Sequence, residues 1–300
     1  MCHNIAGPKG ISLAAETAAL TRPRVRASIS NDGFNYVCDL VRDQSAIVLE
    51  AGKLYLVERR LGLVARQGGF DSVQTMVDSL RTSRAGPLHR TVVEAMTNNE
   101  TLFFRNPRVF SMLTSHILPA LTAHLGSERT LNIWCAACST GQEPYSLEML
   151  VREAPSCGSR RVYLLASDFS NEALARARAG RYTQFEVNRG LPAPMLVKYF
   201  KQHRTAWEIS PQLQQAIQFE EINLTQPWPA LPAMNLIVLR NVLIYFDAET
   251  RRKILSKVAR LLAPGGYLVL GASENTMEGD AGFEAVSFEG TICFRVTRER

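Results

Sequence analysis

The stretch that decides the fold is LNIWCAACSTGQEP, residues 131–144. It opens with a short apolar run over 131–135, passes through small residues, and leads into a helical pattern over 143–152. Such a run followed by a helix is typical of a strand–loop–helix unit in a parallel sheet. The small side chains would let a ligand approach the backbone of the loop closely.

The same alternation continues along the chain. Apolar runs lie at 162–166, 236–239 and 267–270, and helical patterns lie at 171–179 and 249–262. Short apolar strands between amphipathic helices predict an α/β fold with a mostly parallel sheet covered on both faces. The last two runs, 283–288 and 291–297, are separated only by Glu289 and Gly290, so we expect an antiparallel hairpin that closes the sheet.

Residues 30–94 show helical spacing without strands. Apolar residues recur at i, i+3, i+4 and i+7 from Phe34 and again from Val73, and between these stretches Leu54, Val57, Leu61 and Val64 form a further stripe at helical spacing. Asp71 stands where the N-cap of the third stripe is expected. The pattern predicts a small domain of three or four short helices.

The chain therefore divides into an expected flexible leader at 1–29, a helical domain at 30–94 and an α/β domain at 95–300. Of its 300 residues 46% are hydrophobic and 21% are charged, which is globular composition. No apolar run approaches the ~20 residues of a membrane span, and the first residues lack the apolar core of a signal peptide. We expect a cytoplasmic protein without membrane insertion.

Charge and cysteine spacing exclude several classes of protein. The net charge of +6 is spread evenly, with 12 basic and 9 acidic residues up to Met96 and 22 and 19 beyond it, which does not favour nucleic-acid binding. Cys135 and Cys138 form a lone CxxC, and the five histidines are scattered, so we expect neither a metal site nor structural disulfides.

Ligands of such sheets bind beyond the carboxyl ends of the strands. The loop after the first strand has a single glycine, Gly141, which counts against the G-x-G-x-x-G fingerprint of nicotinamide cofactors. Asp168, at the end of the second strand, suits a ribose diol, although it could instead cap the next helix. Asn223 and Leu224 follow another expected strand and suit the edge and face of an adenine.

Four stretches carry a family resemblance. They are NNETLFFR at 98–105, CSTGQEPYS at 138–146, RNVLIYFD at 240–247 and GASEN at 271–275. In this order and spacing the chain, from about Gly33 onward, resembles the CheR family of chemotaxis receptor methyltransferases. The resemblance implies a class I S-adenosylmethionine (SAM) methyltransferase fold, Rossmann-like, with a helical N-terminal domain and a small antiparallel β-subdomain at about 178–222.

The resemblance also implies the activity, which is transfer of a methyl group from SAM to glutamate side chains on the cytoplasmic helices of chemoreceptors. The other product would be S-adenosyl-L-homocysteine. The implied SAM contacts are Asn99, Thr101, Arg105, Glu143, Asp168, Asn223, Leu224, Arg240 and Asn241, and Arg105 and Tyr245 would lie closest to the methyl group. An ionised glutamate is already a nucleophile, so this reaction needs orientation and not a general base.

One departure from the family bears on receptor recognition. Members that bind a receptor-tail pentapeptide have a glycine-containing loop in the β-subdomain, whereas 200–207 is short and lacks glycine. We therefore expect a monomer that docks on receptor helices, within receptor arrays, without that tether. Five basic residues could favour an acidic target or merely form a solvated face: Arg176, Arg178, Arg181, Arg189 and Lys198. The alternative function is a non-catalytic SAM-binding sensor or scaffold.

Overall fold

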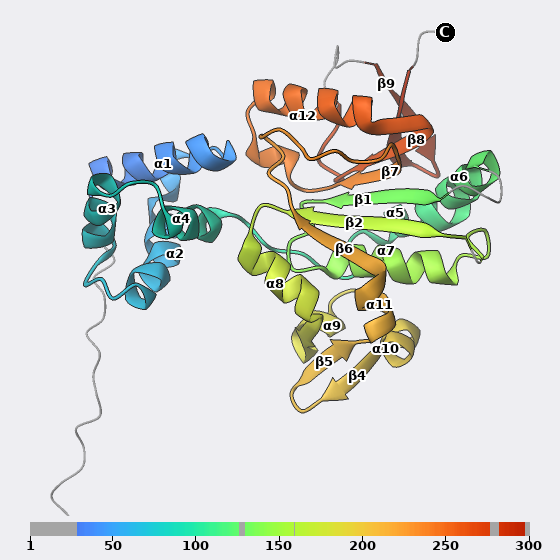
Figure 1. The fold of residues 1–300 in the computed structure, drawn as a ribbon, viewed down its shortest axis with the longest axis horizontal. Coiled ribbons are helices and arrows are strands. Elements are labelled where there is room, and N and C mark those ends of the chain that lie inside the picture. The colour runs from blue at the N-terminus through green and yellow to red at the C-terminus, as the bar shows by residue number, and fades with distance from the viewer. Residues whose placement is uncertain (1–28, 126–129, 159, 277–281, 298–300) are drawn as a thin grey trace, which may run out of the picture.

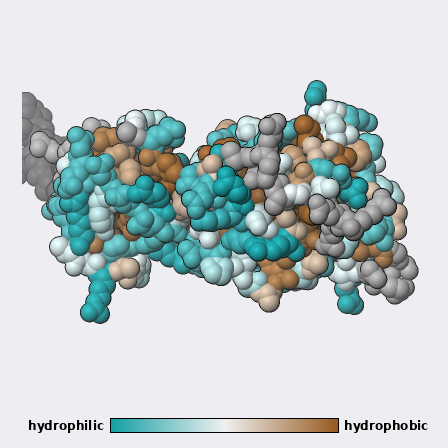
Figure 2. All heavy atoms as spheres, turned by 90° about the horizontal axis from the view of Figure 1, so that it is seen from above, coloured by the Kyte–Doolittle hydropathy of each residue, from teal (hydrophilic) through white to brown (hydrophobic). Residues whose placement is uncertain are grey.

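The computed structural model describes residues 29–125, 130–158, 160–276 and 282–297. The expected leader, apart from Ile29, lies outside these residues. A helical part and an α/β part lie side by side, and a small β-subdomain extends from the second (Figure 1). In the view of Figure 2, hydrophilic and hydrophobic residues are intermixed on both parts. None of the helices in the described ranges is both long and apolar enough to cross a bilayer.

The helical part buries the three predicted apolar stripes. Its elements are α1 (Asn31–Ser45), η1 (Ala51–Lys53), α2 (Leu54–Gln67), α3 (Val73–Thr82) and α4 (Pro87–Met96). Val37, Leu61 and Val77 come from three different helices, and each is fully buried in one shared core. The stripes therefore face one another, as amphipathic helices require.

The N-cap of α3 is Ser72, so the prediction of Asp71 was wrong by one residue. The Ser72 side chain accepts a hydrogen bond from the backbone N–H of Thr75 at 3.0 Å, and the Thr75 side chain accepts one from the backbone N–H of Ser72 at 3.1 Å. This reciprocal capping box needs an extended residue directly before the first helical one, a position that Ser72 holds.

The α/β part is built on a seven-stranded sheet of order β6-β2-β1-β7-β8-β10-β9. Its strands are β1 (Leu131–Ala136), β2 (Val162–Asp168), β6 (Ile217–Glu221), β7 (Met234–Leu239), β8 (Leu262–Leu270), β9 (Phe283–Phe288) and β10 (Thr291–Val296). The first five are parallel, whereas β9 and β10 form an antiparallel hairpin against β8. This confirms the predicted fold class.

Helices cover both faces of the sheet (Figure 1). One face packs against α5 (Pro107–Met112), the π-helical turn η2 (Leu113–Ile117), α6 (Leu118–Leu125), α7 (Gln142–Glu153) and α8 (Asn171–Ala179), and the other packs against α12 (Ala248–Leu261). Along β1, Ile133 and Cys135 enter the first core, whereas Trp134 and Ala136 enter the second. Both faces of the strand are apolar because both are buried.

The strand predicted at 267–270 is longer than its apolar run. In the structure β8 begins at Leu262, which pairs with Met234, and the register shifts between Met234 and Leu236. The expected turn at Pro264, Gly265 and Gly266 is therefore an irregularity within the strand. Residues 263–266 lie opposite the single residue Asn235, and Gly265, at φ +76°, provides the left-handed backbone within this irregularity.

The predicted antiparallel β-subdomain is present. It contains β3 (Arg181–Thr183), α9 (Gln184–Asn188), α10 (Ala193–Tyr199), β4 (Phe200–His203), β5 (Ala206–Ile209) and α11 (Pro211–Ala216). The three strands form a sheet of order β3-β5-β4. Only Arg204 and Thr205 join β4 to β5, and Arg204 supplies the left-handed turn residue, at φ +57°, in place of a glycine.

Candidate active site

A pocket of about 880 Å³, part of it open to solvent, lies beyond the carboxyl ends of β1, β2, β6 and β7. The strand order reverses between β1 and β7, the switch point at which ligands bind in such sheets. All ten residues that the sequence singled out line this pocket: Asn99, Thr101, Arg105, Glu143, Asp168, Asn223, Leu224, Arg240, Asn241 and Tyr245.

The loop between β1 and α7 forms the floor of the pocket with an unusual backbone. Ala137, Ser139 and Gly141 all have positive φ, at 55°, 51° and 95°. Left-handed residues other than glycine are costly and persist where the surroundings hold them. A Cβ atom on Gly141 would lie 2.9 Å from both the Ala177 Cβ and the Tyr182 hydroxyl, so the loop needs its glycine here.

Asp168 is buried beneath this loop, with 8% of its surface exposed. Its Oδ2 accepts a hydrogen bond from the Ser139 N–H at 2.8 Å, and its Oδ1 accepts one from the Ser170 N–H at 2.9 Å. Burial raises the pKa of Asp168, and these backbone donors oppose that rise. Each carboxylate oxygen keeps a further lone pair, which suits the two hydroxyls of a ribose.

The alternative role of Asp168, capping the next helix, is not the one the structure gives it. The N-cap of α8 is Ser170, whose hydroxyl accepts a hydrogen bond from the Ala173 N–H at 3.2 Å. Asp168 is instead the last residue of β2, and its Oδ1 accepts a hydrogen bond from the N–H of Ser170, the residue just before α8. Its carboxylate therefore remains available to the pocket.

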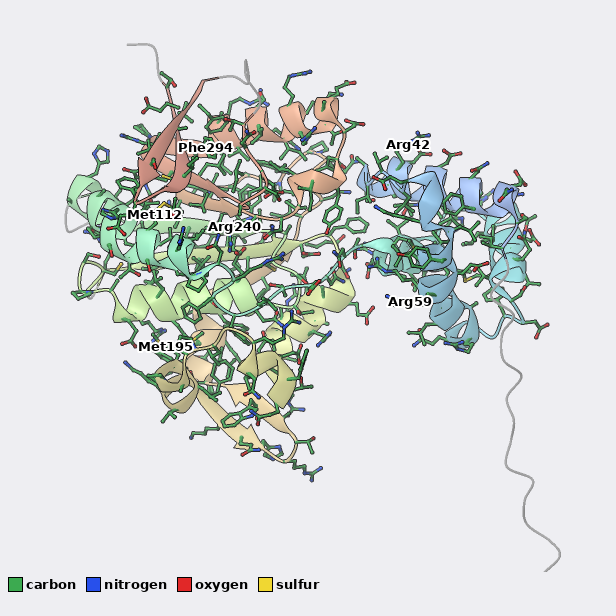
Figure 3. The ribbon with its side chains drawn as sticks, turned by 180° about the vertical axis from the view of Figure 1, so that it is seen from behind. Arg42, Arg59, Met112, Met195, Arg240 and Phe294 are labelled. Atoms are coloured by element: carbon green, nitrogen blue, oxygen red, sulfur yellow. The ribbon has the colours of Figure 1, made fainter. Side chains whose placement is uncertain are left out.

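Glu143 and Arg240 form a buried ion pair on the pocket wall. Their side chains are 10% and 3% exposed, and Figure 3 shows Arg240 inside the α/β part. Arg240 Nη2 also donates to the backbone oxygen of Arg105 at 2.8 Å, and the Cys135 thiol donates to Glu143 Oε2 at 3.5 Å. The Arg240 Nε is buried and has no hydrogen-bond partner among the described residues.

Arg105 and Tyr245 reach the pocket from two neighbouring loops. Arg105 Nη1 donates to the Glu100 backbone oxygen at 3.2 Å, and among the described residues no carboxylate pairs with its guanidinium. Tyr245 lies in the 3₁₀ turn η3 (Leu243–Tyr245), where its hydroxyl accepts a hydrogen bond from Asn98 Nδ2 at 2.7 Å. A half-buried guanidinium without an acidic partner is suited to an incoming carboxylate.

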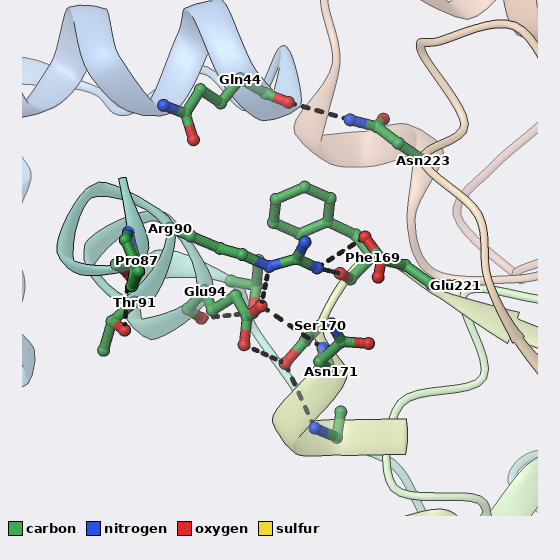
Figure 4. Close-up of polar contacts among 12 residues, drawn as sticks. Gln44, Pro87, Arg90, Thr91, Glu94, Phe169, Ser170, Asn171, Glu221 and Asn223 are labelled. Atoms are coloured by element: carbon green, nitrogen blue, oxygen red, sulfur yellow. Dashed lines mark hydrogen bonds and ion pairs between the residues drawn. The ribbon is translucent and has the colours of Figure 1, made fainter. Parts of the chain in front are cut away.

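Asn223 lines the pocket, and its side chain also forms hydrogen bonds within the protein. Its Nδ2 donates to the Gln44 backbone oxygen at 2.9 Å (Figure 4). Its Oδ1 accepts from the N–H and hydroxyl of Thr225. The side chain thus ties the end of α1 to the pocket rim. Leu224 and Ile222 are buried beside it and supply the apolar wall.

The helical part is fastened to the pocket by contacts that the sequence did not indicate. Arg90 pairs with Glu94 at 2.7 Å and with Glu221 at 2.6 Å, and Ser170 donates to Glu94 at 3.2 Å (Figure 4). Five wall residues that sequence reasoning did not single out come from this part and its linker: Ser45, Ile47, Thr97, Asn98 and Glu100. Asn98 is the first residue of one of the family stretches, and that position could have identified it as a pocket residue. No feature of the sequence indicated Ser45 or Ile47.

The five basic residues singled out in the sequence, in α8 and the β-subdomain, do not form a free positive patch. Four of them pair with carboxylates, namely Arg176 with Glu186, Arg181 with Glu208, Arg189 with Glu100 and Lys198 with Glu153, and Arg178 donates to the Phe219 backbone oxygen. Exposed pairs of this kind contribute little to stability. The solvated-face interpretation is therefore the one the contacts favour.

Fold and pocket together define a class of protein. A sheet in this order, a loop of small residues at its switch point, a buried carboxylate at the end of the next strand and an apolar wall form the arrangement of class I SAM-dependent methyltransferases. SAM fits the residues present, because Asp168 has lone pairs for the ribose, Ile222 and Leu224 can face the base, and the unpartnered Arg240 Nε can donate to a carboxylate.

Comparisons with known proteins specify the class further. The family described as "CheR methyltransferase, SAM binding domain" matches residues 99–291, and "CheR methyltransferase, all-alpha domain" matches 32–97. Chemotaxis protein methyltransferase 1 of Pseudomonas aeruginosa is 39% identical over 252 residues, covering 82% of this chain and 91% of the relative. Chemotaxis protein methyltransferase 1 of Vibrio cholerae is 33% identical over 278 residues, covering 90% and 98%. The chain belongs to the CheR methyltransferase family, and its methyl donor is SAM.

Proposed function

We propose that this protein is a protein-glutamate O-methyltransferase that esterifies glutamate side chains on the cytoplasmic helices of chemoreceptors. The observation that carries the proposal is the composition of the pocket wall. Among the described residues, that wall contains no histidine, lysine or cysteine, but it presents Arg105 and Tyr245. The wall therefore offers no side chain of the types that usually act as general bases near neutral pH. Such a site suits a nucleophile that is already ionised before it binds, and a glutamate side chain is ionised at neutral pH.

The protein's part in the reaction is to bind and orient. SAM, when bound, supplies a methyl group on a sulfonium, from which the acceptor carboxylate takes it. Arg105 docks that carboxylate through its guanidinium, which keeps its proton and so cannot act as a base. The phenol of Tyr245 orients the carboxylate from the other loop, so that oxygen, methyl and sulfur are aligned.

The remaining pocket residues hold the cofactor in this proposal. Asp168 binds the ribose hydroxyls, Leu224 packs on the adenine, and the Glu143–Arg240 pair contacts the methionine portion. The other proposed contacts are Asn99, Thr101, Arg105, Asn223 and Asn241. The occupied side chain of Asn223 supports a contact through its backbone more than through its amide.

Receptor binding proceeds without a pentapeptide tether. The support is the two-residue connection between β4 and β5, which leaves no extended loop to grip a peptide. The protein works as a cytoplasmic monomer at receptor arrays, with a helical domain at 30–94 and a catalytic domain at 95–300. Tight binding of a peptide that ends in the tethering sequence would contradict this, and light scattering tests the monomer.

Labelled methyl transfer tests the proposed activity. The protein is incubated with methyl-labelled SAM and cytoplasmic receptor fragments from the same organism, and base-labile methanol is measured. We expect release that Arg105→Ala abolishes and that Arg84→Ala, which removes an exposed arginine between α3 and α4, leaves unchanged. SAM binding without methanol release from any fragment would favour the sensor or scaffold alternative.

A further inference from the structure

The carboxylate of Glu274 joins the two loops that follow β7 and β8. Its Oε2 accepts hydrogen bonds from the backbone N–H groups of Asn241, at 2.7 Å, and Gly271, at 2.8 Å. Its Oε1 accepts one from the N–H of Ile244 at 3.3 Å. One side chain therefore satisfies three backbone donors at the edge of the sheet where the pocket lies.

The surroundings of Glu274 are shaped to hold a carboxylate. A Cβ atom on Gly271 would lie 2.5 Å from Glu274 Oε2 and 2.8 Å from Asn241 Nδ2, so position 271 has no room for a side chain. Asn241 has a left-handed backbone, at φ +59°, which needs support from outside. A carboxylate only accepts hydrogen bonds and has room for about four of them, so it matches three converging N–H groups better than any neutral side chain.

The turn that Glu274 holds is the one that carries Tyr245. Ile244 directly precedes Tyr245, whose backbone oxygen accepts a hydrogen bond from the Val48 N–H at 3.1 Å. The phenol is held at its other end by Asn98. Backbone and hydroxyl are thus fixed separately, and the Glu274 contact to Ile244 is the attachment of this turn to the sheet edge.

We infer that Glu274 is a positioning residue for methyl transfer, which acts through Tyr245 by fixing the turn from Asn241 to Tyr245. The inference rests on the proposed function, since it assumes that Tyr245 orients the acceptor. Glu274 itself does not line the pocket. Its effect therefore belongs to the chemical step more than to cofactor binding.

The variant Glu274→Gln tests this selectively. Its single carbonyl oxygen can still accept from Asn241 and Gly271, but its NH₂ group then faces the N–H of Ile244. We expect kcat to fall about tenfold, the effect of losing one hydrogen bond to a charged group, while the KM for SAM stays close to that of the unaltered protein. Glu249→Gln removes the same charge from an exposed ion pair on α12 and should change neither constant.

A double-mutant cycle separates positioning from general destabilisation. If Glu274 acts through Tyr245, the fold-loss in kcat of the double variant, Glu274→Gln with Tyr245→Phe, should be smaller than the product of the fold-losses of the two single variants. Full multiplicativity would overturn the inference. So would a Glu274→Gln enzyme with the kcat of the unaltered protein, or a loss of kcat that follows a matching loss of folded protein in the melting curve.

Hydrogen exchange keeps this test independent of the proposed activity. Should the unaltered protein form no base-labile ester, the proposed function fails, and the exchange rates of individual amides still report on Glu274. We expect the Ile244 amide to exchange faster in Glu274→Gln while the Asn241 amide stays protected. Equal protection of Ile244 in both proteins would overturn the positioning role.

Discussion

Replacing Arg240 by methionine tests the buried ion pair that supports the pocket wall. Methionine fills a similar volume without charge, so the change leaves Glu143 buried with its Oε1 unpaired and removes the donor to the Arg105 backbone oxygen. Removing one partner of a buried ion pair lowers the free energy of unfolding by about 3–5 kcal/mol, because the remaining buried charge is uncompensated. For a chain of this size that is a fall in melting temperature on the order of 10 °C.

The assay is denaturant unfolding with thermal melting beside it. Lys253→Met is the matched control, because it breaks a pair of similar geometry whose side chains are both 72% exposed, and it should cost at most about 1 kcal/mol. Adding Glu143→Gln to Arg240→Met removes the stranded charge and should recover part of the loss. If Arg240→Met costs no more than the control, the pair does not hold the wall and the reasoning is refuted.

Three further changes test other parts of the site. Burial raises the pKa of Asp168, so its carboxyl takes up a proton at a higher pH than an ordinary aspartate does. The SAM affinity measured by calorimetry should therefore begin to fall, as the pH is lowered, before an ordinary aspartate would be protonated, and Asp168→Asn should bind SAM weakly at every pH; an affinity that does not change with pH would contradict the role of this carboxylate. Asn98→Ala removes the donor to the Tyr245 hydroxyl and should lower kcat about fivefold in steady-state kinetics with SAM affinity retained, whereas an unchanged kcat would contradict the role of that bond. Gly190 has φ +88°, and a Cβ atom added there would lie 2.1 Å from a backbone oxygen, whereas Gly69, at φ +77°, has nothing within 4 Å of an added Cβ. Gly190→Ala should therefore destabilise the protein by more than the ~1–2 kcal/mol expected of the control Gly69→Ala. Equal melting temperatures of the two variants would contradict the close packing at Gly190.

Most of the fold could be predicted from the sequence because its signals are local. The strand runs and the apolar stripes depend on neighbouring residues, and they placed α8, at 171–179, with the bounds the structure has. One error arose where strand pairing overrides local signals, because β8 pairs with β7 on both sides of Pro264 and the two glycines. The other error was local, because Ser72, and not Asp71, stands three residues before Thr75 and forms the capping box with it.

The sequence predicted which residues line the candidate site better than it predicted the contacts that their side chains make. Seven of the ten pocket residues lie in the family stretches, and Asp168, Asn223 and Leu224 were indicated by the expected strand ends, but neither signal revealed what each side chain touches. Asn223 bonds to Gln44, which lies 179 positions earlier, and Arg240 bonds to Glu143, 97 positions earlier. The first contact depends on how the helical part packs on the sheet and the second on how β1 and β7 pair, and no spacing within one stretch encodes either.

The central claim is that the methyl group is placed on a glutamate side chain, and fragmentation mass spectrometry tests it most directly. Receptor cytoplasmic fragments are incubated with the protein and SAM, digested, and sequenced before and after mild base. We predict a mass gain of one methylene on glutamate, lost on base treatment and absent with Arg105→Ala. A base-stable methyl group, or one on lysine, arginine or another residue, would contradict the account.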